Sequence, residues 1–107
     1  MNELRIEECV WLNDHALEYA VDYGLTEDAV VTAMARPLRA FGFYRRGVRQ
    51  LDTVVVMIGM DIYYVVVKTA RDEDGLYTEV VTVMDESNGK RNETGVSSER
   101  PFAIDLV

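Results

Sequence analysis

The chain has 107 residues, a net charge of −8 and a composition of 49% hydrophobic and 28% charged residues, which is typical of one soluble globular domain. Its longest near-continuous apolar run, 54–60, is far shorter than the roughly 18 residues that a membrane span needs, and its first residues lack a basic and apolar leader. One cysteine and one histidine exclude an intrachain disulfide and metal sites with several cysteines or histidines. We therefore expect a cytoplasmic protein with no metal, no cofactor and no membrane association.

The first third of the chain predicts one strand and two helices. Residues 4–12 alternate between apolar and polar at their start, which indicates a strand. Asn13 and Asp14 indicate an N-cap for a helix from His15 to about Tyr23. A second helix begins after Thr26 and ends before Pro37, because the residue that precedes a proline avoids helical angles.

The middle of the chain predicts strands joined by short turns. Alternation over 38–46 and β-branched residues over 53–58 indicate two strands, and two more follow at 62–69 and 76–84. Strands joined by short turns are antiparallel neighbours, and two consecutive helices most easily cover one face of a sheet. The predicted fold class is α+β: a single domain over residues 1–84, built as a two-layer sandwich of strand, helix, helix and antiparallel meander.

The last residues differ from this domain in composition. Val96 is the only strongly apolar residue of segment 85–100, which therefore predicts a polar mobile linker. Segment 101–107 is apolar again. It is expected to dock as an edge strand on its own sheet or, alternatively, to add to the sheet of a partner.

Positive charge is concentrated in one segment. Residues 36–51 hold five arginines and no acidic residue, while 1–35 and 52–107 are both acidic. Because arginine binds phosphate and carboxylate with two parallel hydrogen bonds, this segment predicts a phosphate-binding surface. Alternatively, its arginines pair with the protein's own carboxylates or with a second subunit. The candidate binding residues are Arg36, Arg39, Phe41, Phe43, Arg49 and Arg71.

The predicted strand over 38–46 has two alternative orientations. Its odd-numbered residues share one face and are Arg39, Phe41, Phe43 and Arg45. If this face is exposed, its arginine and aromatic side chains are suited to bind phosphates and stack on bases. Alternatively, Phe41 and Phe43 face the core, Tyr44 points outward, and the arginines extend from the strand ends to solvent.

The helices and sheet also resemble a known group of proteins. The segments that carry the resemblance are His15-Ala16-Leu17-Glu18, Leu25-Thr26-Glu27-Asp28-Ala29-Val30, Arg36-Pro37 and the turn from Asp72 to Gly75. Over residues 5–84 the chain resembles small families at the margin of the RelE/ParE/BrnT toxin superfamily, in which a His-Ala-x-x-Arg helix precedes a second helix and an antiparallel sheet. The resemblance implies a RelE/ParE-like α+β sheet and a toxin of a toxin–antitoxin pair, often a ribonuclease that acts on messenger RNA. Tyr19 stands where the pattern has arginine, and this chain is acidic where those toxins are usually basic.

A metal-independent ribonuclease needs an acid–base group and cations that stabilise the charge developing on the phosphate. The candidate catalytic residues are His15, Arg45, Arg46 and Lys68. His15 begins the first predicted helix, where the helix dipole favours the neutral imidazole that a general base requires. Alternatively, His15 is structural or simply exposed, and Lys68 belongs to a solvated strand end.

Two functions remain open at this stage. The first is a toxin-like protein that binds or cleaves RNA. The second is a non-enzymatic acidic protein binder, such as an immunity protein or a phage-encoded inhibitor of a bacterial defence system, because acidic surfaces dock onto basic clefts that bind nucleic acid. The expected partners are an antitoxin or a basic target protein, and RNA for the first function. A homodimer formed through strand edges is a third alternative.

Overall fold

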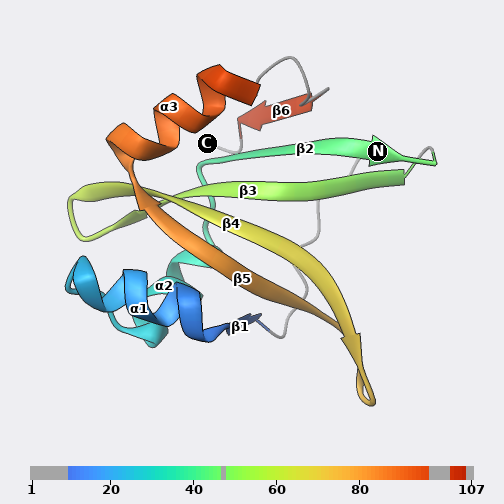
Figure 1. Ribbon diagram of the computed structural model, residues 1–107, viewed down its shortest axis with the longest axis horizontal. Coiled ribbons are helices and arrows are strands. Elements are labelled where there is room, and N and C mark those ends of the chain that lie inside the picture. Colours follow the sequence, from blue (N-terminus) through green and yellow to red (C-terminus); the bar gives the residue numbers. More distant parts are fainter. Residues whose placement is uncertain (1–9, 47, 97–101, 106–107) are drawn as a thin grey trace.

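Six strands form one mixed sheet, with helices on both of its faces (Figure 1). The computed structural model describes residues 10–46, 48–96 and 102–105. The elements in chain order are β1 (Val10–Leu12), α1 (Asp14–Asp22), α2 (Glu27–Met34), β2 (Arg39–Arg45), β3 (Val48–Ile58), β4 (Asp61–Asp72), β5 (Gly75–Asp85), α3 (Glu86–Val96) and β6 (Phe102–Asp105). The strand order across the sheet is β1-β5-β4-β3-β2-β6. The α+β class and the predicted meander from β2 to β5 are confirmed.

The boundaries of the first two helices follow from local hydrogen bonds. The Asn13 side chain accepts a hydrogen bond from the Ala16 N–H at 2.9 Å, and the Thr26 hydroxyl accepts one from the Ala29 N–H at 3.1 Å. Each bond satisfies a backbone donor that the first turn of a helix leaves without an intrahelical partner. Gly24 separates the two helices with a φ of +75°, a conformation that glycine adopts without steric cost. Both predicted N-caps are therefore confirmed.

The edges of the sheet come from opposite ends of the chain. β1 pairs with β5 in parallel, with Leu12 opposite Val80, so the first strand returns across the sheet to the end of the meander. β6 pairs antiparallel with β2, with Arg39 opposite Asp105. The apolar C-terminal segment thus docks on its own sheet as an edge strand, which is the first of the two alternatives that the sequence left open.

One face of the sheet packs against α1 and α2 and contains the larger core. Side chains from α1, α2 and the sheet are fully buried there, among them Leu12, Ala16, Ala20, Val30, Met34, Val54, Val56, Val65, Val80 and Val83. The helices and this face form the predicted two layers. Because side chains alternate along a strand, the neighbouring residues point to the opposite face.

The opposite face carries a smaller apolar cluster that α3 partly covers. Phe41, Val55 and Tyr64 are its buried members, and α3 lies on the side of the sheet away from α1 and α2 (Figure 1). Gly89 of α3 lies directly against the side chain of Tyr64, so close that a Cβ at this position would be 2.2 Å from the ring.

The prediction of a polar mobile linker over residues 85–100 is corrected by α3, although residues 97–100 lie outside the described part of the chain. Two local features and one long-range hydrogen bond favour a helix there without an apolar stripe. The Asp85 carboxylate accepts a hydrogen bond from the Asn88 N–H at 2.9 Å, as an N-cap does. Glu86 and Lys90 form an i,i+4 ion pair at 3.4 Å. The Asp85 N–H also donates to the Tyr23 hydroxyl at 3.1 Å, which ties the start of α3 to the end of α1.

β3 and β4 separate from each other at the end of the sheet that lies away from the turn joining them. β3 and β4 are paired from Ile58 opposite Asp61 as far as Thr53 opposite Val66. Beyond that point, within the described residues, β3 continues with β2 and β4 continues with β5, and the two hairpins diverge (Figure 1). No helix in the described part of the chain is long and apolar enough to cross a membrane.

The stability of this fold is expected to fall at high pH. Burial, and then the negative charges of nearby groups led by Asp61, raise the pKa of the Tyr63 phenol above its ordinary value of 10.0. The folded protein therefore favours the neutral phenol, and this contribution is complete below pH 10 and is lost as the pH rises through the folded-state pKa. Urea unfolding at pH 9 and pH 11 should show a smaller loss for Tyr63→Phe than for the wild type. An equal loss in both proteins would contradict this assignment.

Candidate functional site

The described members of the predicted catalytic set lie on separate elements. His15 is exposed on α1, where its ring meets the Tyr19 ring edge-on at 4.7 Å. Arg46 is exposed in the β2–β3 turn with a φ of +52°, and this turn and α1 lie at opposite ends of the molecule (Figure 1). Lys68 is on β4, where its ammonium lies 3.7 Å from the Glu79 carboxylate. His15 and Arg46 therefore do not share a site.

The predicted stacking face on β2 is corrected at Phe41. Phe41 is only 3% exposed, and its ring stacks on that of Tyr64 with the centroids 6.3 Å apart. The Arg39 guanidinium lies over the Phe41 ring at 4.8 Å. The physical reason is that the second face of the sheet has its own core beneath α3. Phe41 therefore follows the core-facing alternative.

The other candidate residues divide into two groups. Arg36 and Arg71 are exposed, the first just after α2 and the second near the end of β4. The side chains of Phe43, Tyr44, Arg45 and Arg49 lie outside the part of the chain that the structure describes, although their backbones belong to β2 and β3.

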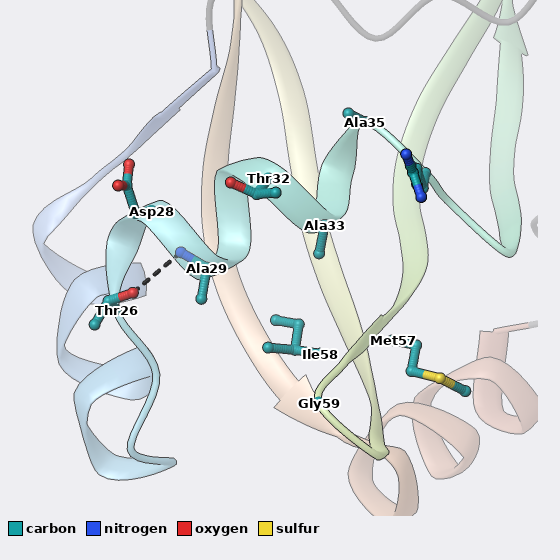
Figure 2. Close-up of a pocket in the computed structure, with 10 residues that line it drawn as sticks. Thr26, Asp28, Ala29, Thr32, Ala33, Ala35, Met57, Ile58 and Gly59 are labelled. Atoms are coloured by element: carbon teal, nitrogen blue, oxygen red, sulfur yellow. Dashed lines mark hydrogen bonds between the residues drawn. The ribbon is translucent and has the colours of Figure 1, made fainter.

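An open groove lies between α2 and the β3–β4 hairpin (Figure 2). Its floor is apolar, because Ala29 and Ala33 are one helical turn apart and both point toward Ile58 (Figure 2). These small side chains leave the space above Ile58 unfilled. We call this feature, with Arg36 at one end, the hairpin groove.

The rim of the hairpin groove combines exposed apolar surface with two opposite charges. Met60, in the turn beside the groove, is 94% exposed, and Met57 is 50% exposed with its side chain directed away from Ala29 and Ala33 (Figure 2). Asp28 lies in the first turn of α2 and Arg36 just beyond its last turn. Because a helix rises about 1.5 Å per residue, these two charges are too far apart to neutralise each other and act separately on whatever enters the groove.

Sequence reasoning named Arg36 as a candidate phosphate-binding residue but predicted neither the groove nor its apolar residues. Two signals were available: alanines four residues apart on a predicted helix, and methionines on either side of a hairpin glycine. Neither signal distinguishes a groove from a filled core, since the difference depends on where the helix is placed relative to the hairpin. Among the described residues no group of three or more His, Cys, Asp or Glu side chains is placed to hold a metal ion.

Comparison with protein-family models, with curated proteins and with solved structures finds no match for this chain. The interpretation of its function therefore depends on its own residues and geometry.

Proposed function

We propose that this protein acts by binding a second protein and that the hairpin groove receives an apolar side chain of that partner. The observation that carries the proposal is the apolar floor of Ala29, Ala33 and Ile58, which is left open beside the exposed Met60 (Figure 2). Exposed apolar patches of this kind mark interaction surfaces, and methionine adapts its flexible side chain to a partner's shape. Binding of this type needs no catalytic group, which agrees with the separation of His15 from Arg46.

The charges at the groove indicate the chemistry of the segment that enters it. Arg36 lies at the end of α2 nearer the sheet, where a carboxylate of the partner would form a charge-assisted hydrogen bond. Asp28 at the other end favours a basic neighbour. The proposed occupant is therefore a segment with an apolar side chain that enters above Ile58 and an acidic residue that pairs with Arg36. An antitoxin or the target of an inhibitor would each meet this description.

The test compares two matched variants in a search for the partner. Ala29→Glu introduces a negative charge at the groove floor, and Val21→Glu introduces the same charge at an exposed position of α1. The partner, identified by affinity purification from the source organism and then prepared pure, is expected to bind Ala29→Glu at least about tenfold more weakly than wild type, because central interface residues carry most of the binding energy. Val21→Glu should bind like wild type. Equal affinities for both variants would reject the groove as the contact surface.

A second candidate function is RNA binding or cleavage by a toxin-like protein. It is supported by the β2–β3 hairpin, which carries Arg45, Arg46 and Arg49 and extends away from the β4–β5 hairpin beyond Thr53. A protruding basic hairpin suits contact with a phosphate backbone.

Induced expression in a bacterial culture separates the two candidates. A toxin would arrest growth, and Arg46→Glu or His15→Ala would relieve the arrest without lowering the amount of folded protein. A protein binder of the proposed kind would leave growth unchanged at the same expression level. RNA binding that weakens with added salt and with Arg46→Glu would then support the second candidate directly.

A further inference from the structure

A second feature lies on the face of the sheet opposite α1 and α2, at the β1 edge. Trp11 stands opposite Glu79 in the parallel register of β1 and β5, and Tyr77 precedes Glu79 by two residues, so all three side chains share this face. The Trp11 and Tyr77 rings are nearly perpendicular, at 83°, with their centroids 6.3 Å apart. We call these three residues the aromatic corner. Trp11 is 48% exposed, so the corner is open to solvent.

The carboxylate of the aromatic corner is held in place through one oxygen. Glu79 Oε2 accepts a hydrogen bond from the Asn13 side chain at 3.1 Å and lies 3.7 Å from the Lys68 ammonium. Glu79 Oε1 takes part in neither of these contacts, and it remains an acceptor for an incoming donor. Asn13 also caps α1 and is thereby fixed, which orients the carboxylate before any ligand arrives.

The ion pair between Lys68 and Glu79 is weak enough to yield to a ligand. The Lys68 side chain is 60% exposed, and the distance of 3.7 Å is longer than that of a direct hydrogen bond. The Glu79 side chain is only 14% exposed, but its partner Lys68 is largely solvated, so water screens the attraction and the long lysine side chain loses freedom when it is held. A better-placed cation would therefore replace Lys68 at low cost.

We propose that the aromatic corner binds the guanidinium group of an arginine on a basic partner protein. Unlike lysine, arginine has a flat face to lie against the Trp11 ring and an edge of N–H donors to meet Glu79 Oε1 at the same time, and unlike histidine it is always charged near neutral pH. The protein's net charge of −8 favours the approach of a basic partner over long range. The hairpin groove lies on the α2 side of the sheet, so this contact is separate from the proposed function and does not depend on it.

The test uses the intrinsic fluorescence of Trp11, which is the only tryptophan in the chain. The probe is a blocked pentapeptide, acetyl-Gly-Gly-Arg-Gly-Gly-amide, and its control contains citrulline, which has the shape of arginine without the charge. The arginine peptide should change the Trp11 emission in a saturable way at low ionic strength. The citrulline peptide should bind at least about fivefold more weakly, because both the charge-assisted hydrogen bond and the attraction to the ring are lost.

Matched variants distinguish the corner from general attraction to an acidic protein. Glu79→Gln keeps an acceptor for Asn13 and should weaken binding of the arginine peptide by about fivefold or more. Glu73→Gln makes the same change of charge in the exposed β4–β5 turn and should change the affinity by no more than about twofold, because solvent screens a distant charge. Lys68→Met should strengthen binding, since it removes the competing cation.

Three results would overturn the proposal: no saturable response to the arginine peptide, equal binding of the citrulline peptide, or equal effects of Glu79→Gln and Glu73→Gln. Circular dichroism checks that each variant is folded. If Glu79→Gln does not fold, Tyr77→Leu replaces it. Tyr77→Leu removes one wall of the corner and leaves Trp11 as the reporter, and unchanged binding by it would equally reject the site.

Discussion

Replacing Leu12 with alanine is expected to lower the free energy of unfolding by about 3 kcal/mol, within the range of roughly 2–5 kcal/mol for buried leucines. Leu12 is only 1% exposed and lies on β1, beside Val80 of β5, in the core that α1 and α2 cover. Truncation removes three carbon atoms from a closely packed site and leaves a cavity that the short edge strand is poorly able to fill. Urea denaturation followed by circular dichroism measures the change.

The matched control is Leu76→Ala, the same substitution at a position on β5 that is 47% exposed. Because little apolar surface is buried there, the change in stability should stay below about 1 kcal/mol. Similar losses in the two variants would mean that β1 does not contribute to the core as described. The comparison therefore tests the parallel pairing of β1 with β5, on which the aromatic corner also depends.

Gly89→Ala is expected to destabilise the protein by about 1–3 kcal/mol, the usual cost of forcing extra volume into a packed site. In most helices this substitution is stabilising by nearly 1 kcal/mol, because alanine has the higher helix propensity. Here the added Cβ would lie 2.2 Å from two ring carbons of Tyr64 and 2.8 Å from its Cβ. These atoms lie at the base of a buried side chain that cannot move aside easily, so the sign of the effect reverses.

Ser87→Ala provides the control for Gly89→Ala. Ser87 is exposed on the same helix, two residues earlier, and its replacement should change the free energy of unfolding by less than about 0.5 kcal/mol. Stabilisation by Gly89→Ala would show that α3 does not pack against Tyr64. Loss of stability in Gly89→Ala alone would confirm that α3 covers the second face of the sheet.

Features that depend on neighbouring residues were predicted correctly from the sequence. The caps at Asn13 and Thr26 act on backbone donors three residues away, and the short turns that follow β3 and β4 join strands that are consecutive in the chain. The sequence of such a segment contains both partners of the interaction. For the same reason the α+β class and the meander could be predicted, whereas the link to the RelE/ParE/BrnT superfamily stays a prediction.

Features that depend on distant residues could not be predicted in the same way. α3 has no apolar stripe, and its position depends on contact with Tyr64, which is far away in the sequence. Phe41 could be assigned to a core only once α3 was known to cover the second face. Arg36 was identified by its charge, but the floor above Ile58 that gives it a role is formed by the placement of α2.

The sequence by itself thus determined the helix caps, the turns, the antiparallel meander and the uneven distribution of charge, because each of these is a property of adjacent residues. Only the tertiary structure decided which side chains from distant segments of the chain lie together. Asn13 reaches Glu79 across 66 residues of sequence, and Trp11 joins them because β1 returns to pair with β5. The physical reason is that burial and side-chain pairing depend on the distances between segments in space, and many arrangements of the same helices and strands satisfy the local pattern equally well.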